Sequence, residues 1–143
     1  MIHYNISYNK PHRHFVDFEF STNTNGEKSI LLQLPAWRPG RYELANYAQN
    51  IQRWDALDEN GEKLSFQKLT KDLWEVQTKN TNTITIRYTY YANQLDAGAS
   101  YLDENQLYLN PVNCCYYIVG REKEEYHMKF DIPQDYIIAC GLE

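Results

Sequence analysis

Short segments in which apolar and polar residues alternate one by one recur along this 143-residue chain, and they limit its fold more than any other feature. Successive side chains of a strand point to opposite faces, so such alternation predicts a strand with one buried face and one solvated face. The predicted strands include residues 2–8, 16–20, 30–34, 83–90 and 126–132. Helical spacing is rare between them. The chain is therefore predicted to be all-β.

Turn-forming residues indicate how these strands follow one another. Asn25-Gly26 supplies the positive φ angles of a tight hairpin, which predicts that strands 16–20 and 30–34 pair with each other. Asn60-Gly61 interrupts residues 54–76, which are predicted to form a meander. Pro133 ends one strand, and residues 136–138 are predicted to begin another. Short strands at this spacing are typical of an antiparallel β-sandwich.

One short helical turn is expected near residues 41–50, where Leu44, Tyr47, Ala48 and Ile51 have helical spacing. The length fits one domain, which we place at residues 1–141. The last two residues, Leu-Glu at 142–143, are interpreted as a possible cloning remnant.

Charge and cysteine content exclude several classes of function. The net charge is −5 and the basic residues are dispersed, so a nucleic-acid partner is not expected. No apolar run approaches the roughly 20 residues that span a bilayer, and the N-terminus lacks the features of a signal peptide, so no membrane partner is expected. Three cysteines make a disulfide framework improbable and favour a reducing compartment, hence the cytoplasm, while export of a longer parent protein stays open.

Three groups of residues could suggest chemistry, and each has a simpler explanation. His12-Arg13-His14 could bind a metal, but no Cys, Asp or Glu set completes a site nearby in the sequence. Cys114-Cys115 lies in an apolar run without an activating His, which is typical of core cysteines. Asp103-Glu104 is explained by an exposed loop. We therefore predict no catalytic residue and no metal ligand in this chain.

A segment rich in proline and aromatic residues remains. Pro35 and Pro39 fix φ near −65°, Gly40 permits a sharp turn, and Trp37 lies between the prolines with Tyr42 close behind. Such a segment offers either a rigid contact surface or a packed corner in which Trp37 fills the core. The sequence leaves both interpretations open.

This segment resembles the N-terminal domain of the glycyl aminopeptidases, which carries the motif Leu-Pro-x-Trp-x-Pro-Gly-x-Tyr. Residues 34–42 match it throughout, and 47–51 resemble the family's Tyr-Ala-Arg-Asn-Val with Gln49 in place of Arg. The similarity continues in family order through residues 86–92, 100–104, 107–111 and 117–121. One departure is Pro111, which follows Asn110 where the family usually has Gly.

The resemblance implies a larger enzyme. It would join this non-catalytic β-sandwich to a thermolysin-like domain, in which a His-Glu-x-x-His helix and a downstream Glu bind zinc, and often to a PDZ domain. The chain would then pack on its own C-terminal catalytic domain and line one wall of a cleft for peptide substrates. It would itself hold no cofactor, because the zinc would belong to the catalytic domain.

By analogy with related aminopeptidases, a polar residue of this domain would help to hold the free amine of the substrate. Asn110, with Tyr108 and Glu104, is the candidate group for the cleft side. The alternative is that Asn110 only forms a turn before Pro111.

Two rival functions remain open. With 13 Tyr and 3 Trp, the chain could be a self-standing binding module for carbohydrate or protein. It could also be a purely structural domain, which would expose an apolar patch where it packs on its neighbour.

Overall fold

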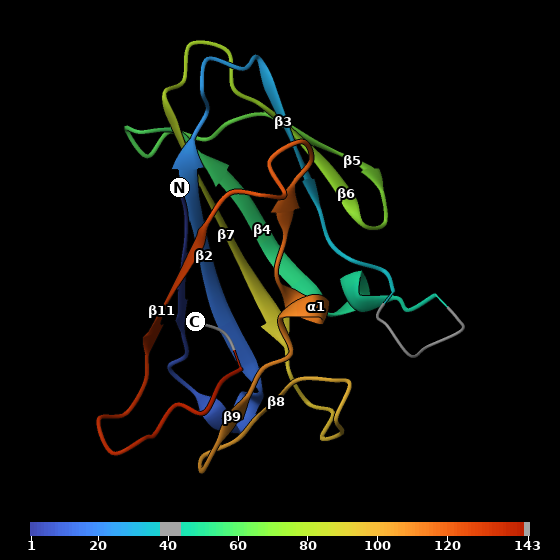
Figure 1. Ribbon diagram of the computed structural model, residues 1–143, viewed down its shortest axis with the longest axis vertical. Helices are drawn as coiled ribbons and strands as arrows, with labels where there is room; N and C mark the ends of the chain where they lie inside the picture. Colours follow the sequence, from blue (N-terminus) through green and yellow to red (C-terminus); the bar gives the residue numbers. More distant parts are fainter. Residues whose placement is uncertain (38–43, 142–143) are drawn as a thin grey trace.

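The computed structural model describes residues 1–37 and 44–141. Its strands are β1 (Ile2–Ser7), β2 (Phe15–Asn23), β3 (Ser29–Gln33), β4 (Ile51–Leu57), β5 (Phe66–Thr70), β6 (Leu73–Gln77), β7 (Thr83–Tyr91), β8 (Tyr101–Leu102), β9 (Leu107–Tyr108), β10 (Tyr117–Ile118) and β11 (Tyr126–Asp131). The helical segments are η1 (Pro11–Arg13), η2 (Tyr47–Asn50) and α1 (Pro111–Cys114). Strands dominate, as the alternation predicted (Figure 1).

The strands form two packed sheets and a small ribbon. The five-stranded sheet has the order β11-β1-β2-β7-β4, the four-stranded sheet has the order β10-β3-β6-β5, and β8 pairs with β9. All pairs are antiparallel except β1 with β11, which run parallel. The β-sandwich prediction is confirmed, with this one parallel edge as an addition that alternation cannot reveal.

Alternation correctly identified the buried faces. In β7, Ile84, Ile86, Tyr88 and Tyr90 are all buried, while Arg87 between them is exposed. Strands β1 and β2 follow the same rule. Each large side chain moved from water into this core contributes about 1.5–3 kcal/mol, so the two inner faces hold the sandwich together.

Buried tyrosines use their hydroxyl groups to fix the segment between α1 and β10. The Tyr88 hydroxyl donates to the carbonyl of Cys114 at 2.5 Å, and the Tyr4 hydroxyl donates to the carbonyl of Tyr116 at 3.0 Å. The backbone N–H of Tyr116 in turn donates to the Tyr4 hydroxyl at 2.6 Å. Polar atoms this deep need partners, so these bonds hold residues 114–116 in one position over the sheet.

The prediction that the second and third strands pair is wrong. Asn25 and Gly26 do adopt positive φ angles of 55° and 74°, but the turn carries the chain from one sheet to the other. The physical reason is that β2 is a central strand, with β1 on one side and β7 along its whole length on the other. No edge of β2 is left for β3.

The meander prediction is correct only for β5 and β6. Strand β4 joins the other sheet, beside β7, and Gly61 at φ 78° lies in the tight turn after β4, where Leu57 bridges Lys63 before the chain crosses over. The strand predicted at residues 136–138 is absent. The backbone N–H of Tyr136 bonds the carbonyl of Pro133 at 3.0 Å, and this turn redirects the chain before a ladder can form.

The helical turn expected near residues 41–50 is confirmed over Tyr47–Asn50, which form η2, while residues 41–43 lie outside the described residues. The helix α1 was not predicted. Asn110 provides its N-cap and Pro111 its first residue, a pairing that favours a helix start. No helix within the described ranges is both long and apolar enough to cross a membrane.

Candidate functional site

A large apolar groove of about 1080 Å³ lies beside β11. Its walls are Ile6, Leu107, Leu109, Pro111, Cys114, Cys115, Tyr126, Met128, Phe130, Ile132 and residues 136–141. The inner face of β11, formed by Tyr126, Met128 and Phe130, is only half-buried, whereas the equivalent row of β1 is fully buried. The four-stranded sheet ends at the two-residue β10 and leaves β11 uncovered.

The segment after β11 forms the outer wall of the groove and exposes apolar side chains of its own. Ile137 is 95% exposed and Ile138 is 58% exposed. In Figure 1 this segment turns back beneath β11 toward β9 and α1. Apolar surface that gathers in one concave place marks an interaction site, whereas single exposed apolar residues do not.

Cys114 lies at the base of this groove and is fully buried, which confirms the prediction of a core cysteine. Burial raises the pKa of its thiol well above the ordinary value, so the thiolate needed for nucleophilic attack is disfavoured. Its neighbour Cys115 is half-buried.

The three candidate substrate residues lie along one stretch that begins at the β8–β9 turn. Glu104 is exposed in that turn, and its carbonyl accepts a hydrogen bond from the Tyr136 hydroxyl at 3.4 Å. The Tyr108 side chain is 40% exposed, and its hydroxyl donates to the carbonyl of Ala97 at 3.2 Å. Leu107 and Leu109 on either side of Tyr108 line the groove, so this stretch connects the candidates to it.

Asn110, the third candidate, has a structural task. Its side-chain oxygen accepts from the backbone N–H of Val112 at 3.4 Å, which caps α1. Its own backbone N–H donates to the Ser100 hydroxyl at 3.0 Å, and that hydroxyl donates to the buried Asn113 side chain at 2.6 Å. Asn110 is half-buried, and its chain neighbours Leu109 and Pro111 line the groove.

The Pro-rich motif is only partly described. Pro35 is half-buried and Trp37 is 50% exposed, so Trp37 does not fill the core. Pro39, Gly40 and Tyr42 lie outside the described residues. The described ends of the segment are held together, because the N–H of Ala45 bonds the carbonyl of Ala36 at 2.7 Å.

The other chemical candidates are dispersed. His12 and Arg13 are exposed in η1, while the half-buried His14 places Nδ1 2.5 Å from the carbonyl of Leu102. The Asp103 carboxylate accepts backbone N–H groups of its own turn, which lowers its pKa. Within residues 1–37 and 44–141, no group of three or more His, Cys, Asp or Glu side chains could hold a metal ion.

A crystal structure of an aminopeptidase N family protein from Idiomarina loihiensis is similar to this chain, with a TM-score of 0.81 and 26% sequence identity. The match covers 91% of this chain and 22% of that protein, so this chain spans about a fifth of the relative's length. No curated protein matches. The family model for the peptidase M61 N-terminal domain matches residues 3–143. This β-sandwich, with its open apolar edge, thus belongs to the peptidase M61 N-terminal domain family.

Proposed function

We propose that this chain serves a larger zinc-dependent aminopeptidase as a non-catalytic domain, which packs on the catalytic domain and lines its substrate cleft. The family match and the longer relative support the proposal that this chain is one domain of a larger aminopeptidase. The observation that carries it is the open groove beside β11, which a catalytic neighbour would cover.

The energetics favour a covered groove. Burial of apolar surface contributes about 25 cal/mol per Å², so half-buried side chains such as Met128 and Phe130 add further stability when a partner removes their exposed part from water. The side chains of the walls are almost wholly apolar, and the exposed acidic residues Glu104, Glu125 and Asp135 adjoin the lining residues Tyr126 and Tyr136. An apolar centre with a polar rim is the usual anatomy of an interface between protein domains.

The zinc would lie in the catalytic domain, since the described residues of this chain do not fit a zinc site. When bound there, the metal would polarise the scissile carbonyl and lower the pKa of a water molecule. This chain would supply the wall formed by the β8–β9 ribbon, with Asn110, Tyr108 and Glu104 near the free amine of a glycyl peptide. The free thiols of Cys114 and Cys115 support placing the protein in a reducing compartment, the cytoplasm.

The docking test compares two neighbouring residues of β11 in the full-length protein. Met128→Glu places a charge in the groove, whereas Lys129→Glu places one on the opposite face of the same strand. We expect Met128→Glu to lower aminopeptidase activity at least tenfold and to make the junction between the domains sensitive to protease, with Lys129→Glu close to wild type. Equal behaviour of the two variants would exclude the groove as the docking surface.

A further inference from the structure

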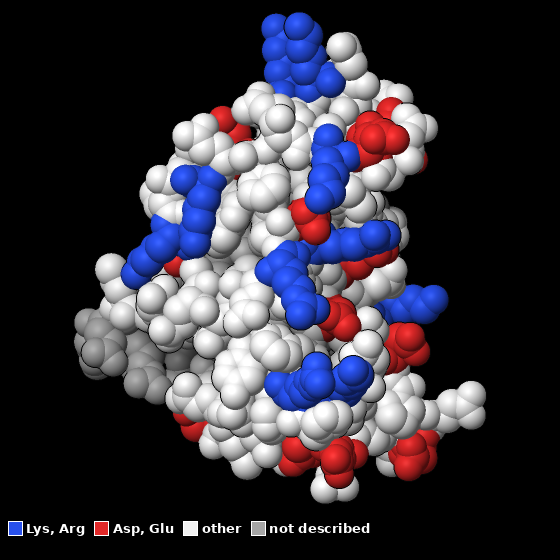
Figure 2. Space-filling model, turned by 180° about the vertical axis from the view of Figure 1, so that it is seen from behind, with Lys and Arg blue, Asp and Glu red and all other residues white. Residues whose placement is uncertain are grey.

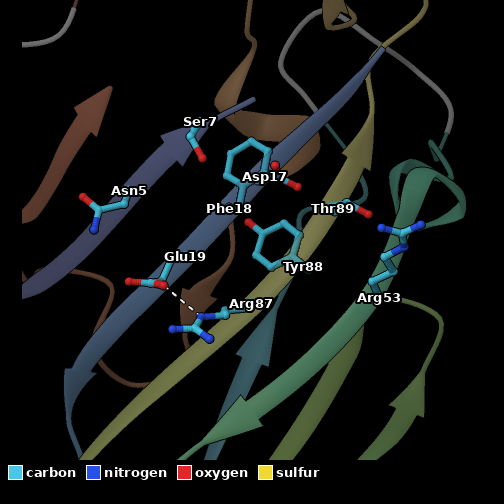
Figure 3. A pocket seen from close by; sticks show the side chains of 9 residues that line it. All are labelled: Asn5, Ser7, Asp17, Phe18, Glu19, Arg53, Arg87, Tyr88 and Thr89. Carbon is cyan, nitrogen blue, oxygen red and sulfur yellow. Dashed lines mark hydrogen bonds and ion pairs between the residues drawn. The ribbon is translucent and has the colours of Figure 1, made fainter. Parts of the chain in front are cut away.

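A second concave feature, of about 310 Å³, lies on the outer face of the five-stranded sheet. Figure 3 shows the residues that line it, which come from β1, β2, β7 and β4: Asn5, Ser7, Asp17, Phe18, Glu19, Arg53, Arg87, Tyr88 and Thr89. Asn5 and Ser7 project from the face of β1 opposite to Ile6, which lines the apolar groove. The two features therefore lie on opposite sides of the sheet, and this polar recess would stay open after docking at the groove.

The recess contains charged side chains of both signs, and only two of them form an ion pair with each other. Glu19 and Arg87 form an ion pair at 2.9 Å across β2 and β7. Neither the Asp17 carboxylate nor the Arg53 guanidinium makes a hydrogen bond or ion pair within the described ranges, although each feels the charge of the other. Figure 2 shows the wider surface from behind, where basic and acidic side chains are interspersed without a large area of one sign.

A local irregularity of β4 places Arg53 in the recess. Gln52 pairs with Thr89, but Asp55 pairs with Arg87, so the strand holds one extra residue between these pairs. Arg53 takes up this bulge with φ at 53°. Its side chain joins the outer face, where regular alternation would have turned it inward.

The same bulge turns Trp54 into the core, where its ring stacks on Trp74 with centroids 5.7 Å apart. The next residues, Asp55 outside and Ala56 inside, resume the normal order. A bulge that re-aims one charged side chain toward a concave surface is a common device beside binding sites.

From these contacts we infer that the recess binds a small zwitterion, an α-amino acid or a dipeptide, with its ammonium on Asp17 and its carboxylate on Arg53. Asp17 and Thr89 pair across adjacent strands, and Arg53 extends from the next strand beyond. Two strand spacings amount to roughly 10 Å, and Asp17 lies close enough to Arg53 for its pKa to respond to the Arg53 charge, a separation that a small zwitterion and its hydrogen bonds can bridge. The volume is at the lower end of the roughly 300–1,000 Å³ of small-molecule pockets, which limits the ligand to this size.

The electrostatics of Asp17 agree with this ligand. Desolvation raises the pKa of its carboxyl, and the charge of Arg53 only partly opposes the rise. Around it stand Glu19 on its own strand, Arg87 on β7, Arg53 on β4 and the uncharged Ser7 on β1. A bound ammonium would offset the desolvation of the carboxylate, and a guanidinium binds a carboxylate through two parallel hydrogen bonds.

Ligands of other classes match only part of the recess. A simple anion would meet Arg53 but also the carboxylates of Asp17 and Glu19, and a simple cation would meet Arg53 as a like charge. A neutral sugar would gain no aromatic stacking, because the Phe18 and Tyr88 rings lie in the core, stacked on each other at 5.0 Å.

The test is a titration of this chain, followed by the backbone amide signals of residues 17–19 and 87–89 in NMR spectra. The probes are L-alanine and L-alanyl-L-alanine, with acetate, ethylammonium and methyl glucoside as single-feature comparisons. We expect the two zwitterions to shift these signals saturably, with at least tenfold weaker binding of each comparison compound.

Two substitutions remove the proposed ligand contacts. Arg53→Asn keeps a residue that tolerates positive φ, and Asp17→Asn keeps the shape of the side chain. Each should weaken alanine binding at least tenfold, while Lys79→Asn, which removes a positive charge from the exposed turn before β7, should leave it unchanged. Absence of saturable shifts with both zwitterions, equal binding of acetate, or wild-type affinity in both recess variants would overturn the assignment.

This experiment is independent of the proposed peptidase role, because it uses neither the groove nor the catalytic domain. A failed docking test with a positive titration would refute the interface alone, and the reverse result would refute the recess alone.

Discussion

At the scale of single residues, Asn110 combines two tasks that can be separated. Its side-chain oxygen caps α1, and the same side chain is the proposed contact of the substrate amine, between Leu109 and Pro111 of the groove wall. A substitution that removes both tasks could not distinguish them. A pair of substitutions that keeps or removes the oxygen can.

Asn110→Ala in the full-length enzyme should raise the KM for peptides with a free amine and should cost about 1 kcal/mol of domain stability, because the cap is lost. Asn110→Asp keeps an oxygen for the cap and adds a negative charge. If the residue faces the ammonium, we expect Asn110→Asp to lower the KM for these substrates. Steady-state kinetics with free-amine and N-acetylated peptides measure both effects.

The control for Asn110 is Tyr101→Phe, which changes the neighbouring ribbon without touching the cap. A KM that stays at the wild-type value in both Asn110 variants, with only the stability of Asn110→Ala reduced, would limit Asn110 to its capping role.

At the scale of elements, the bulge in β4 decides which side chains of that strand reach each face. Its cost is a left-handed backbone at Arg53, a conformation that residues other than Gly, Asn and Asp adopt at a penalty of about 1–2 kcal/mol. What it maintains is the inward Trp54, which contacts Trp74 and, at 4.6 Å between ring centroids, Phe66. Trp54, which the bulge turns inward, thus connects the edge of one sheet to the edge of the other.

Arg53→Val should destabilise the fold by about 1–3 kcal/mol, since a branched Cβ strongly disfavours positive φ. Arg53→Gly should lie within about 1 kcal/mol of the wild type, because relief of the left-handed strain opposes the greater entropy of the unfolded chain. Urea unfolding followed by tryptophan fluorescence gives both values. Equal destabilisation by Arg53→Val and Arg53→Gly would show that the loss of the guanidinium, not backbone strain, is responsible.

Individual strands could be predicted from the sequence because alternation is a local property. Residues 84–90 identify β7 and its buried face without any knowledge of its neighbours. The pairing could not be predicted, because a turn such as Asn25-Gly26 fixes a local φ but not the sheet in which the next strand lies. The apolar Ile137 and Ile138 gave a wrong strand prediction for a related reason, since their burial requires surface that the described part of this chain does not provide.

The candidate site could be predicted only in part. The resemblance directed attention to Asn110 and the β8–β9 ribbon, and the structure connects that stretch to the groove through Leu107 and Leu109. The recess on the other face could not be predicted from the sequence, because it depends on a single extra residue in β4. Its one signal was the sequence Gln52-Arg53-Trp54, where two polar residues in succession break the alternation.

At the scale of the whole molecule, the first and last strands pair side by side, and a cluster of charges closes the same end. Arg121 donates to the Thr22 hydroxyl and to the carbonyl of Asn23, each at 2.8 Å, and forms an ion pair with Glu124. The Met1 amino group bonds Glu124 at 3.0 Å. Hydrogen bonds from Arg121 and then from this amino group lower the pKa of Glu124 to about 2.

Glu124→Gln should therefore weaken the fold at neutral pH. A lowered carboxyl pKa contributes stability above the ordinary Glu value of about 4.3, and that contribution disappears as the pH falls from there to about 2. We expect the urea midpoints of wild type and Glu124→Gln to differ at pH 7 and to converge near pH 2. Glu27→Gln, in the exposed turn after β2, is the matched control, and a Glu124→Gln difference independent of pH would contradict the role of this ion cluster.

The parallel pairing of β1 with β11 has a consequence during protein synthesis. Ile2 and Tyr126 are partners, so one edge of β1 lacks its neighbour until 124 further residues have been translated. At about 5–20 residues per second, that wait is roughly 6–25 s. During this interval the nascent chain presents an apolar strand with unpaired backbone groups, which is the situation that chaperones recognise. The ribosome must release nearly the entire sandwich before its oldest strand is fully enclosed.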